Sequence, residues 1–304
     1  MRITFMGTPD FAVPSLRLLA ERYDVTLVVT RPDAVRSRGK RLEPSPVKVA
    51  ALELGIEVLE ATRVTEDVLA RVRAAEPDVI CVVAYGCLLP NALLEMPRLG
   101  CVNVHGSLLP RWRGAAPIQR AVLEGDERAG VSIMRLVQKM DAGAYCRQAS
   151  VEVGDKGCAQ IMDELSELGA MELVKALDEL ESGTVVWTEQ DESQVTYAAK
   201  VEKAEMCLSP EDSTLVNLRR VRASTDAAPA RLIVAGKGVR ALEARTSDEP
   251  VATASVLVRR GHVFVGCADG TLELVSVKPD GKRAMEASAW AAGLRGADIT
   301  WSRA

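Results

Sequence analysis

Short apolar runs alternate with amphipathic stretches along the first half of the chain. Strand-like apolar runs, several of them rich in β-branched residues, occupy 3–6, 25–29, 56–59, 79–84 and 101–105. Stretches with helical spacing occupy 11–22, 46–54 and 65–75. We expect Asp10 and Thr65 to cap the first and third of these helices. This order predicts a doubly wound, Rossmann-like, mostly parallel α/β sheet.

The pattern changes in the second half. Residues 131–137 and 145–153 predict two further strands on either side of Asp141. A helix over 163–182 has an apolar stripe that we expect to be core, namely Leu165, Leu168, Met171, Leu173 and Leu180. Residues 183–205 are polar and aperiodic, and short glycine-punctuated strand signals follow at 231–234, 254–258, 263–267 and 271–277. We therefore predict a first domain over 1–189, a linker over 190–205 and a small OB-like β-barrel over 206–304.

Composition narrows the class of protein. Hydrophobic residues make up 48% of the 304 residues, which is enough for packed cores. No apolar run approaches the roughly 18 residues that span a bilayer, and the N-terminus has no basic segment followed by an apolar one. We expect a cytoplasmic protein with no membrane association. Seven cysteines without a C-x-x-C pair and two histidines predict neither a disulfide framework nor a metal site.

The net charge of −4 argues against a protein that binds nucleic acid over its whole surface. Between Leu218 and Arg245, however, seven basic residues face two acidic ones. Such a cluster is either a solvated face or a local surface for phosphate groups, and the sequence leaves both readings open.

Polar groups that could carry chemistry gather where the apolar run 101–105 ends. Asn103 and His105 are two residues apart, so they share one face of a strand at its carboxyl end. An amide can donate a hydrogen bond to a developing oxyanion while an imidazole moves a proton, which is a combination suited to acyl transfer. Asp141, in a Met-Asp-Ala-Gly turn, could orient and charge His105 or could simply stabilise that turn.

Six stretches together carry a family resemblance. They are M-G-T-P-D-F-A at 6–12, R-G-K-R-L-E-P-S-P-V-K at 38–48, V-V-A-Y-G-C-L-L-P at 82–90, L-G-C-V-N-V-H-G-S-L-L-P-R-W-R-G-A-A-P-I-Q-R at 99–120, M-D-A-G at 140–143 and V-T-Y-A-A-K at 195–200. In these motifs and in their order, the chain resembles the methionyl-tRNA formyltransferase family. The N-x-H…D core is similar to that of other 10-formyltetrahydrofolate transferases, whereas the remaining motifs favour the tRNA enzymes.

The resemblance implies a reaction and its catalytic residues. The formyl group of 10-formyltetrahydrofolate, a cosubstrate, would pass to the α-amine of methionyl-initiator tRNA for translation initiation. Asn103 would hold the tetrahedral oxyanion, His105 would stabilise that charge and assist proton transfer, and Asp141 would orient His105. No metal is implied.

The resemblance also assigns the binding residues. The folate cosubstrate would contact Ser107, Leu108, Leu109 and Pro110, with Tyr85 and Gly86 beside the pterin. Arg38 and Lys40, in the basic loop 30–48, would contact tRNA phosphates, which position the tRNA without reading its bases. The protein is expected to act as a monomer.

The chain departs from the family at two places in the C-terminal domain. Met206-Cys207-Leu208 stands where the family often has I-D-W, and residues 224–229 lack the usual aromatic run. These departures bear on how that domain packs and contacts tRNA, and they leave the catalytic assignment intact.

Three other functions stay open at this point. A nucleotide-sugar or glycinamide ribonucleotide formyltransferase would keep the three catalytic groups but lack a basic barrel domain. A hydrolase would use water in place of the amine. A non-catalytic RNA-binding protein would use the barrel alone, but the intact Asn103, His105 and Asp141 set argues against it.

Overall fold

The computed structural model describes residues 1–35, 42–294 and 299–304, which form two compact units. The sheet unit comprises Met1–Pro117, Arg128–Glu152 and Met162–Ala198, and the barrel unit comprises Ile118–Glu127, Val153–Ile161 and Ala199–Ala304. The functional division expected from the sequence, into 1–189, 190–205 and 206–304, stays a prediction.

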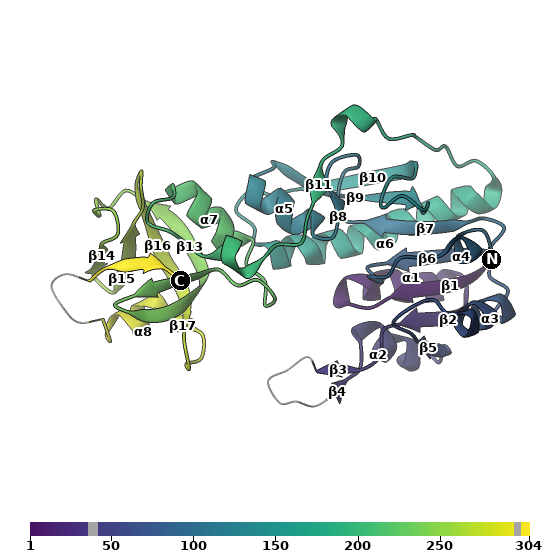
Figure 1. Cartoon of the computed structure of the whole chain (residues 1–304), viewed down its shortest axis with the longest axis horizontal. Coiled ribbons are helices and arrows are strands. Elements are labelled where there is room, and N and C mark those ends of the chain that lie inside the picture. Colours follow the sequence, from purple (N-terminus) through teal and green to yellow (C-terminus); the bar gives the residue numbers. More distant parts are fainter. Residues whose placement is uncertain (36–41, 295–298) are drawn as a thin grey trace. The chain divides into compact units, whose positions relative to one another are not determined.

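Seven strands form the central sheet of the sheet unit, in the order β10-β9-β7-β6-β1-β2-β5 (Figure 1). Their bounds are β1 Arg2–Gly7, β2 Asp24–Thr30, β5 Val58–Glu60, β6 Val79–Val83, β7 Cys101–His105, β9 Arg128–Arg135 and β10 Tyr145–Glu152. All neighbouring pairs from β7 to β5 are parallel, whereas β9 is antiparallel to both β7 and β10. The prediction of a mostly parallel, Rossmann-like sheet is confirmed.

Helices separate the parallel strands along the chain, namely η1 Asp10–Ala12, α1 Val13–Arg22, α2 Pro46–Glu53, α3 Glu66–Ala74 and α4 Asn91–Leu94. Helix α5 Pro117–Glu124 precedes β9, and α6 Cys158–Ser182 follows β10. The sequence predicted α1, α2, α3 and α6 but not α4 or α5. The Thr65 hydroxyl accepts the N–H of Val68 and caps α3, which confirms that expectation. The expected cap at Asp10 is wrong, because the chain first makes the 3-10 turn η1 and α1 then begins at Val13 without a side-chain cap.

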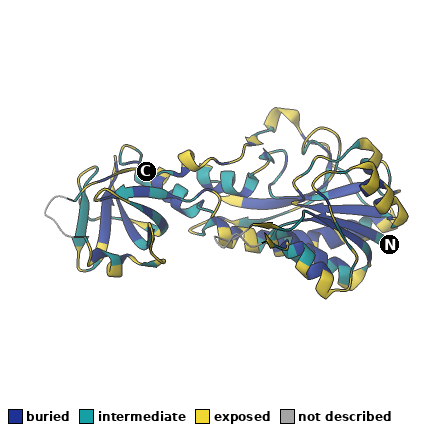
Figure 2. Cartoon of the chain, turned by 60° about the horizontal axis from the view of Figure 1, so that its bottom comes forward, coloured by how far each residue is buried: buried dark blue, intermediate teal, exposed yellow. Residues whose placement is uncertain are grey.

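The buried residues of the sheet unit are concentrated in the inner strands of its sheet, which are dark blue in Figure 2. All five residues of β6 are buried, as expected for a parallel strand covered on both faces. Leu165 and Leu173 of α6 are fully buried, but Met171 is 49% exposed, so its assignment to the apolar stripe is wrong. Met171 is two residues before Leu173, about 200° away around the helix, and therefore faces solvent.

A glycine lets α6 pack closely against the strand that carries the candidate catalytic residues. A Cβ atom at Gly169 would lie 2.8 Å from Cγ1 of Val104. Real Cβ atoms do not approach other atoms this closely, so a larger residue would push α6 away from β7. Gly169 thus helps to fix the position of β7.

The segment expected to be a linker contains short regular elements. These are η2 Glu192–Gln194, β11 Tyr197–Ala198 and η3 Lys203–Met206. In the sheet unit, β11 pairs in parallel with β8, Arg113–Gly114. A second short pair joins β3, Ala34–Val35, to β4, Leu42–Glu43. The β8–β11 pair brings residues near 190–198 to the loop that follows β7.

The barrel unit is a curled antiparallel sheet with the strand order β14-β15-β16-β13-β12-β18, and β17 pairs with β16. Its strands are β12 Arg231–Val234, β13 Lys237–Ser247, β14 Val256–Arg259, β15 His262–Gly266, β16 Thr271–Pro279, β17 Met285–Glu286 and β18 Trp301–Arg303, and its helices are α7 Thr214–Arg222 and α8 Ala287–Ala291. The N–H groups of Val256 and Trp301 donate to the carbonyl oxygens of Ile299 and Ala254, which joins the first strand to the last. The predicted small barrel is confirmed.

Candidate active site

The carboxyl end of β7 lies between β6 and β9 and carries two of the predicted catalytic residues. Asn103 and His105 project from the same face of the strand. His105 is buried, whereas Asn103 is half-buried. Within the part of the chain that the structure describes, the Asn103 amide makes no side-chain hydrogen bond. Because amides in protein interiors are normally hydrogen-bonded, this group is available to a ligand.

Both ring nitrogens of His105 face oxygen atoms. Nε2 is 2.9 Å from the carbonyl oxygen of Trp112, and Nδ1 is 3.8 Å from Oδ2 of Asp141. A carbonyl oxygen can only accept, so the first contact requires a proton on Nε2. The second is within ion-pairing distance but longer than a hydrogen bond. The structure thus brings His105 and Asp141 together across 36 residues of sequence.

Asp141 lies in the turn between β9 and β10 and is held at its side chain and at its backbone. Its backbone φ is +49°, a left-handed conformation that is uncommon outside glycine. Its Oδ2 accepts the N–H of Gly114 at 2.9 Å. The side-chain amide of Gln190 donates to the carbonyl oxygens of Asp141 and Gly143, at 2.8 and 2.7 Å. These contacts fix the turn and aim its carboxylate at His105.

A buried guanidinium lies behind Gln190. Arg113 is 1% exposed, and its Nε donates to Oε1 of Gln190 at 2.8 Å. Its Nη2 donates to Oε1 of Glu192 at 3.0 Å, and this hydrogen bond holds the pKa of Glu192 below its usual value. Gln190 was not predicted from the sequence, because its partners are 47 and 49 residues away. Its proximity to V-T-Y-A-A-K was the only available signal.

The loop expected to border the folate is locked by hydrogen bonds. The Ser107 hydroxyl is buried and donates to the carbonyl oxygen of Arg111 at 2.6 Å. The Ser132 hydroxyl donates to the carbonyl oxygen of Ser107 and accepts the N–H of Leu109, at 2.6 and 3.1 Å. Gln148 donates to both the Ser132 hydroxyl and the Leu109 carbonyl oxygen. This loop is therefore preorganised.

Leu108 and Pro110 are the half-buried members of the same loop, whereas the Leu109 side chain is 3% exposed. Large apolar side chains also stand exposed close in sequence to other predicted site residues. Leu88 is 74% exposed two residues after Gly86, and Met140 is 58% exposed immediately before Asp141. These side chains supply apolar surface of the kind that a flat aromatic ligand requires.

The ring of Tyr85 is buried in the protein and does not face a ligand site. Its side chain is 1% exposed and its hydroxyl donates to the carbonyl oxygen of Ala61 at 2.9 Å. Burial raises the pKa of Tyr85 to about 12, so the hydroxyl stays protonated. Gly86 has a φ of +74°, and Arg31 donates to the carbonyl oxygens of both residues. Of these two residues, Gly86 is therefore the one that a ligand can reach, because it is exposed whereas Tyr85 is buried.

The two predicted tRNA contacts, Arg38 and Lys40, lie outside the described residues. Lys48, at the end of the same basic loop, binds two acids through Nζ, Asp33 at 2.7 Å and Glu60 at 2.9 Å. The hydrogen bond to Asp33, followed by that to Glu60, raises the pKa of Lys48. The positive charge of Lys48 is thus already paired with two carboxylates of the protein.

The basic cluster in 218–245 is largely ion-paired within the barrel unit. Five of its seven basic residues contact acids, in the pairs Arg220–Asp212, Arg222–Asp155, Arg231–Asp280, Arg240–Asp226 and Arg245–Glu273. The Arg240 guanidinium lowers the pKa of Asp226, first through its hydrogen bond and then through its charge. This pairing favours a solvated face over a surface dedicated to phosphates.

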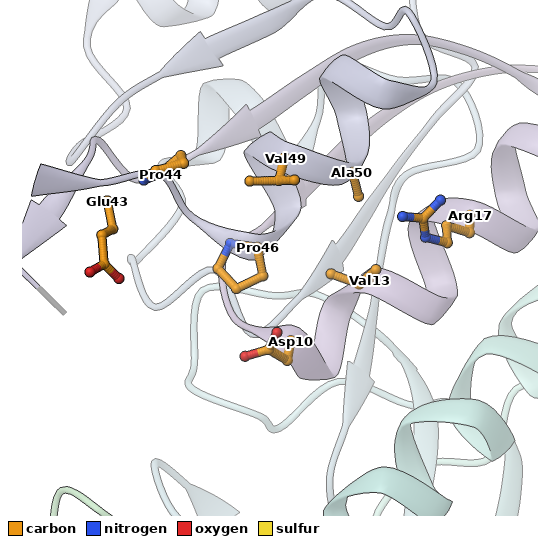
Figure 3. Close-up of a pocket in the computed structure, with 8 residues that line it drawn as sticks. All are labelled: Asp10, Val13, Arg17, Glu43, Pro44, Pro46, Val49 and Ala50. Carbon is orange, nitrogen blue, oxygen red and sulfur yellow. The ribbon is translucent and has the colours of Figure 1, made fainter. Parts of the chain in front are cut away.

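A hollow of about 450 Å³ lies between η1, α1 and the start of α2 (Figure 3). Its lining residues are Asp10, Val13, Arg17, Glu43, Pro44, Pro46, Val49 and Ala50. Asn103, His105 and Asp141 are not among them, so this hollow and the β7 site are different regions.

The described residues form neither a metal-binding cluster nor a membrane-spanning helix. In 1–35, 42–294 and 299–304, no three histidine, cysteine, aspartate or glutamate side chains are grouped so that they could hold a metal ion. None of the helices over these ranges is both long and apolar enough to span a bilayer.

Comparisons with known proteins agree with the motifs. Residues 1–177 match the sequence family described as formyl transferase, and residues 200–295 match the formyl transferase C-terminal domain. Methionyl-tRNA formyltransferase of Methylococcus capsulatus is 43% identical over 94% of this chain and 95% of that protein. The protein of the same name from Methylobacillus flagellatus is 42% identical over 96% of both chains.

Solved structures share the fold at much lower identity. An N-formyltransferase from Helicobacter canadensis, in complex with folinic acid and dTDP-3-aminofucose, has a TM-score of 0.64 and 12% identity over 90% of this chain and 98% of that one. HypX from Aquifex aeolicus, in complex with tetrahydrofolic acid, has a TM-score of 0.66 and 19% identity over 99% of this chain but spans twice its length, so 50% of HypX is covered. The formyl transferase match covers most of the chain, and the relatives named above align over nearly all of it. The chain therefore belongs to the methionyl-tRNA formyltransferase family.

Proposed function

We propose that this chain transfers the formyl group of 10-formyltetrahydrofolate to the α-amine of methionyl-initiator tRNA. The observation that carries the proposal is the arrangement at the end of β7. Asn103, whose amide has no side-chain partner in the described part of the chain, lies on the same strand face as His105, and Oδ2 of Asp141 is 3.8 Å from Nδ1 of His105. The names of the relatives, aligned over nearly the whole chain, support the same activity.

The reaction needs no covalent enzyme intermediate. The amine nitrogen forms a bond to the formyl carbon, and the bond from that carbon to folate N10 then breaks. One proton leaves the amine and one proton reaches N10, so the exchange is balanced. The protein has to hold the two reactants together and stabilise the negative charge that develops on the formyl oxygen.

The residues at β7 suit those two tasks. The Asn103 amide donates a hydrogen bond to the developing oxyanion, because no side-chain contact within the described residues competes for it. His105 stabilises the same charge and moves the proton at Nδ1, since the Trp112 carbonyl oxygen holds the ring by its Nε2. Asp141 faces the other ring nitrogen and balances the positive charge of the protonated ring.

The folate donor fits the residues around this strand end. The hydrogen-bonded loop of Ser107, Leu108, Leu109 and Pro110 presents its backbone and two half-buried side chains, those of Leu108 and Pro110, to the folate. Gly86, which is exposed next to the buried Tyr85, borders the pterin ring. When bound, the folate supplies the activated formyl group.

The tRNA contacts are those that the family resemblance implies. Arg38 and Lys40 bind phosphates near the acceptor end and position the tRNA without reading its bases. A single copy of the chain contains all three catalytic groups, which agrees with activity as a monomer.

A formylation assay with the purified chain tests the proposal. The donor is 10-formyltetrahydrofolate, and the acceptors are methionyl-initiator tRNA, uncharged tRNA, an amino sugar nucleotide and water alone. We expect formyl transfer only to the charged tRNA. Transfer to the amino sugar nucleotide, or formate release that does not depend on tRNA, would replace the proposed substrate by the corresponding alternative.

A further inference from the structure

The contacts around Asp141 point beyond the three proposed catalytic groups. Three consecutive residues, 112–114, reach the His105–Asp141 pair from one side. The Trp112 carbonyl oxygen holds Nε2 of His105, and the Gly114 N–H holds the Asp141 carboxylate. The side chain of Arg113, between them, instead holds Gln190.

We propose that Gln190, oriented by Arg113, is a positioning residue that fixes the Asp141 carboxylate relative to His105. The inference rests on the proposed role of Asp141 in formyl transfer. Gln190 touches neither His105 nor a substrate group, and it acts through the backbone of the turn.

The orientation of the Gln190 amide is fixed chemically. Its Oε1 accepts from Nε of Arg113, so its NH₂ group must face the turn, where two carbonyl oxygens accept both hydrogens. Gln190 is buried, so removing a partner would leave a buried polar group without its hydrogen bond. The turn around Asp141 is thus clamped at the carbonyl groups of residues 141 and 143.

Burying Arg113 only to fill space would be energetically unfavourable. A guanidinium that is 1% exposed loses the free energy of its hydration, whereas an apolar side chain of similar volume would fill the same space with a smaller desolvation penalty. Nη1 of Arg113 has no partner among the described residues, whereas Nε and Nη2 bind Gln190 and Glu192. The arrangement is explained if the guanidinium is kept to orient the amide of Gln190.

The segment that supplies Gln190 also anchors residues 112–114. The N–H of Trp112 donates to the Thr196 hydroxyl and the N–H of Arg113 donates to the Thr196 carbonyl oxygen, both at 2.9 Å. Residues 190–198 therefore fix both sides of the His105–Asp141 contact. Because this contact is already 3.8 Å long, a small shift of the turn separates the two groups further.

The substitution Gln190→Met tests the inference, since it keeps the length of the side chain and removes all three hydrogen bonds. We expect kcat for formyl transfer to fall by about 10- to 100-fold, as for other small misplacements of catalytic groups. KM for the folate and for the charged tRNA should change less than about threefold, because neither substrate contacts Gln190. Gln194→Met is the matched control, because Gln194 is exposed and binds Asp191 instead of the turn.

A double-mutant cycle separates positioning from stability. In the background of Asp141→Asn, Gln190→Met should cause little further loss of the single-turnover rate, because its effect passes through Asp141. An equal fold loss in both backgrounds would overturn the inference, as would a folded Gln190→Met enzyme with unchanged kcat. If Asp141→Asn is itself fully active, the proposed role of Asp141 fails, which is a distinct result.

The two histidines of the chain give a readout that is independent of activity. In nuclear magnetic resonance spectra, the ring signals of His105 should shift in Gln190→Met and stay in place in Gln194→Met, while those of His262 serve as an internal reference. Unshifted His105 signals would also contradict the inference. If Gln190→Met does not fold, Gln190→Asn, which keeps the amide but retracts it by one methylene, takes the same tests.

Discussion

The polar groups at the end of β7 and those on the surface of the barrel unit differ in whether they have partners within the protein. Around β7, the protein satisfies the neighbours of Asn103 with internal contacts and leaves the Asn103 amide without a side-chain partner among the described residues. In the barrel unit, five of seven clustered basic residues are matched by the unit's own acids. A count of charges along the sequence therefore overstates binding capacity, whereas an amide that has no side-chain partner among the described residues, on a strand of the central sheet, indicates a site.

The largest expected effect is at the Asn103 amide. Asn103→Ala should lower kcat by about 10²- to 10³-fold, which is the usual cost of removing one oxyanion donor. Steady-state formylation of charged tRNA measures the effect, and circular dichroism verifies the fold. Asn91→Ala, at an exposed position of α4, should retain activity. A comparable loss in both variants would remove the distinction drawn here.

A smaller effect is expected where the folate loop is locked. Ser132→Ala leaves the buried Ser107 carbonyl oxygen and Leu109 N–H without their shared partner. We expect the free energy of unfolding to fall by about 1–3 kcal/mol. KM for the folate donor should rise up to about tenfold, equivalent to about 1.4 kcal/mol. Thermal unfolding and donor titrations measure the two changes.

Ser182→Ala is the control for that experiment, because this hydroxyl is exposed at the end of α6. It should leave both quantities unchanged. A Ser132→Ala protein with unaltered stability and donor KM would mean that the loop is held in other ways.

A cation proposed to bind tRNA and a cation paired within the barrel unit should respond differently to salt. Arg38→Ala should raise KM for the charged tRNA and reduce the slope of log KM against log salt by about 1. Arg240→Ala should change both quantities less than about twofold, because this guanidinium is already paired with Asp226. Equal effects of the two substitutions would show that pairing within the barrel unit does not limit tRNA binding.

The smallest expected effect concerns the stability of the barrel unit in acid. The Arg245 guanidinium lowers the pKa of Glu273 below its usual value of 4.5, and a hydrogen bond from His262 adds to this effect. A lowered carboxyl pKa stabilises the folded unit above the usual value, and that stability is lost as pH falls through the lowered pKa. Glu273→Gln should therefore cost about 1 kcal/mol at pH 6 and less at pH 3.

Thermal unfolding at the two pH values checks this expectation, with Glu211→Gln, an exposed glutamate of the same unit, as the control. A cost that is the same at pH 3 and pH 6 would show that the charge of Glu273 contributes nothing.

Sequence patterns predicted the parts of the fold that local signals determine. The buried strands of the sheet unit follow from apolar runs, and Thr65 follows from cap chemistry. The prediction that Asp10 caps α1 was wrong because a 3-10 turn intervenes. The prediction that Met171 belongs to the buried stripe of α6 was wrong because apolar character alone does not place a residue on one face of a helix. Strand β13 was missed because charged residues interrupt its apolar alternation.

The candidate site was only partly accessible from sequence. Asn103 and His105 share a strand, so their common face follows from a period of two. The approach of Asp141 and the clamp by Gln190 depend on contacts between residues 36 and 49 positions apart, which a single sequence does not encode locally. The buried ring of Tyr85 likewise depends on packing against Ala61 from another segment.

The two histidines allow the most direct test of the central claim, because one lies at the β7 site and the other lies on the barrel unit beside Glu273. The measurement is the rate of formyl transfer to methionyl-initiator tRNA by His105→Ala and by His262→Ala. We predict a loss of at least about 100-fold for His105→Ala and a rate within about twofold of the parent for His262→Ala. A folded His105→Ala enzyme with the parent's rate would contradict the assignment of the active site to the end of β7.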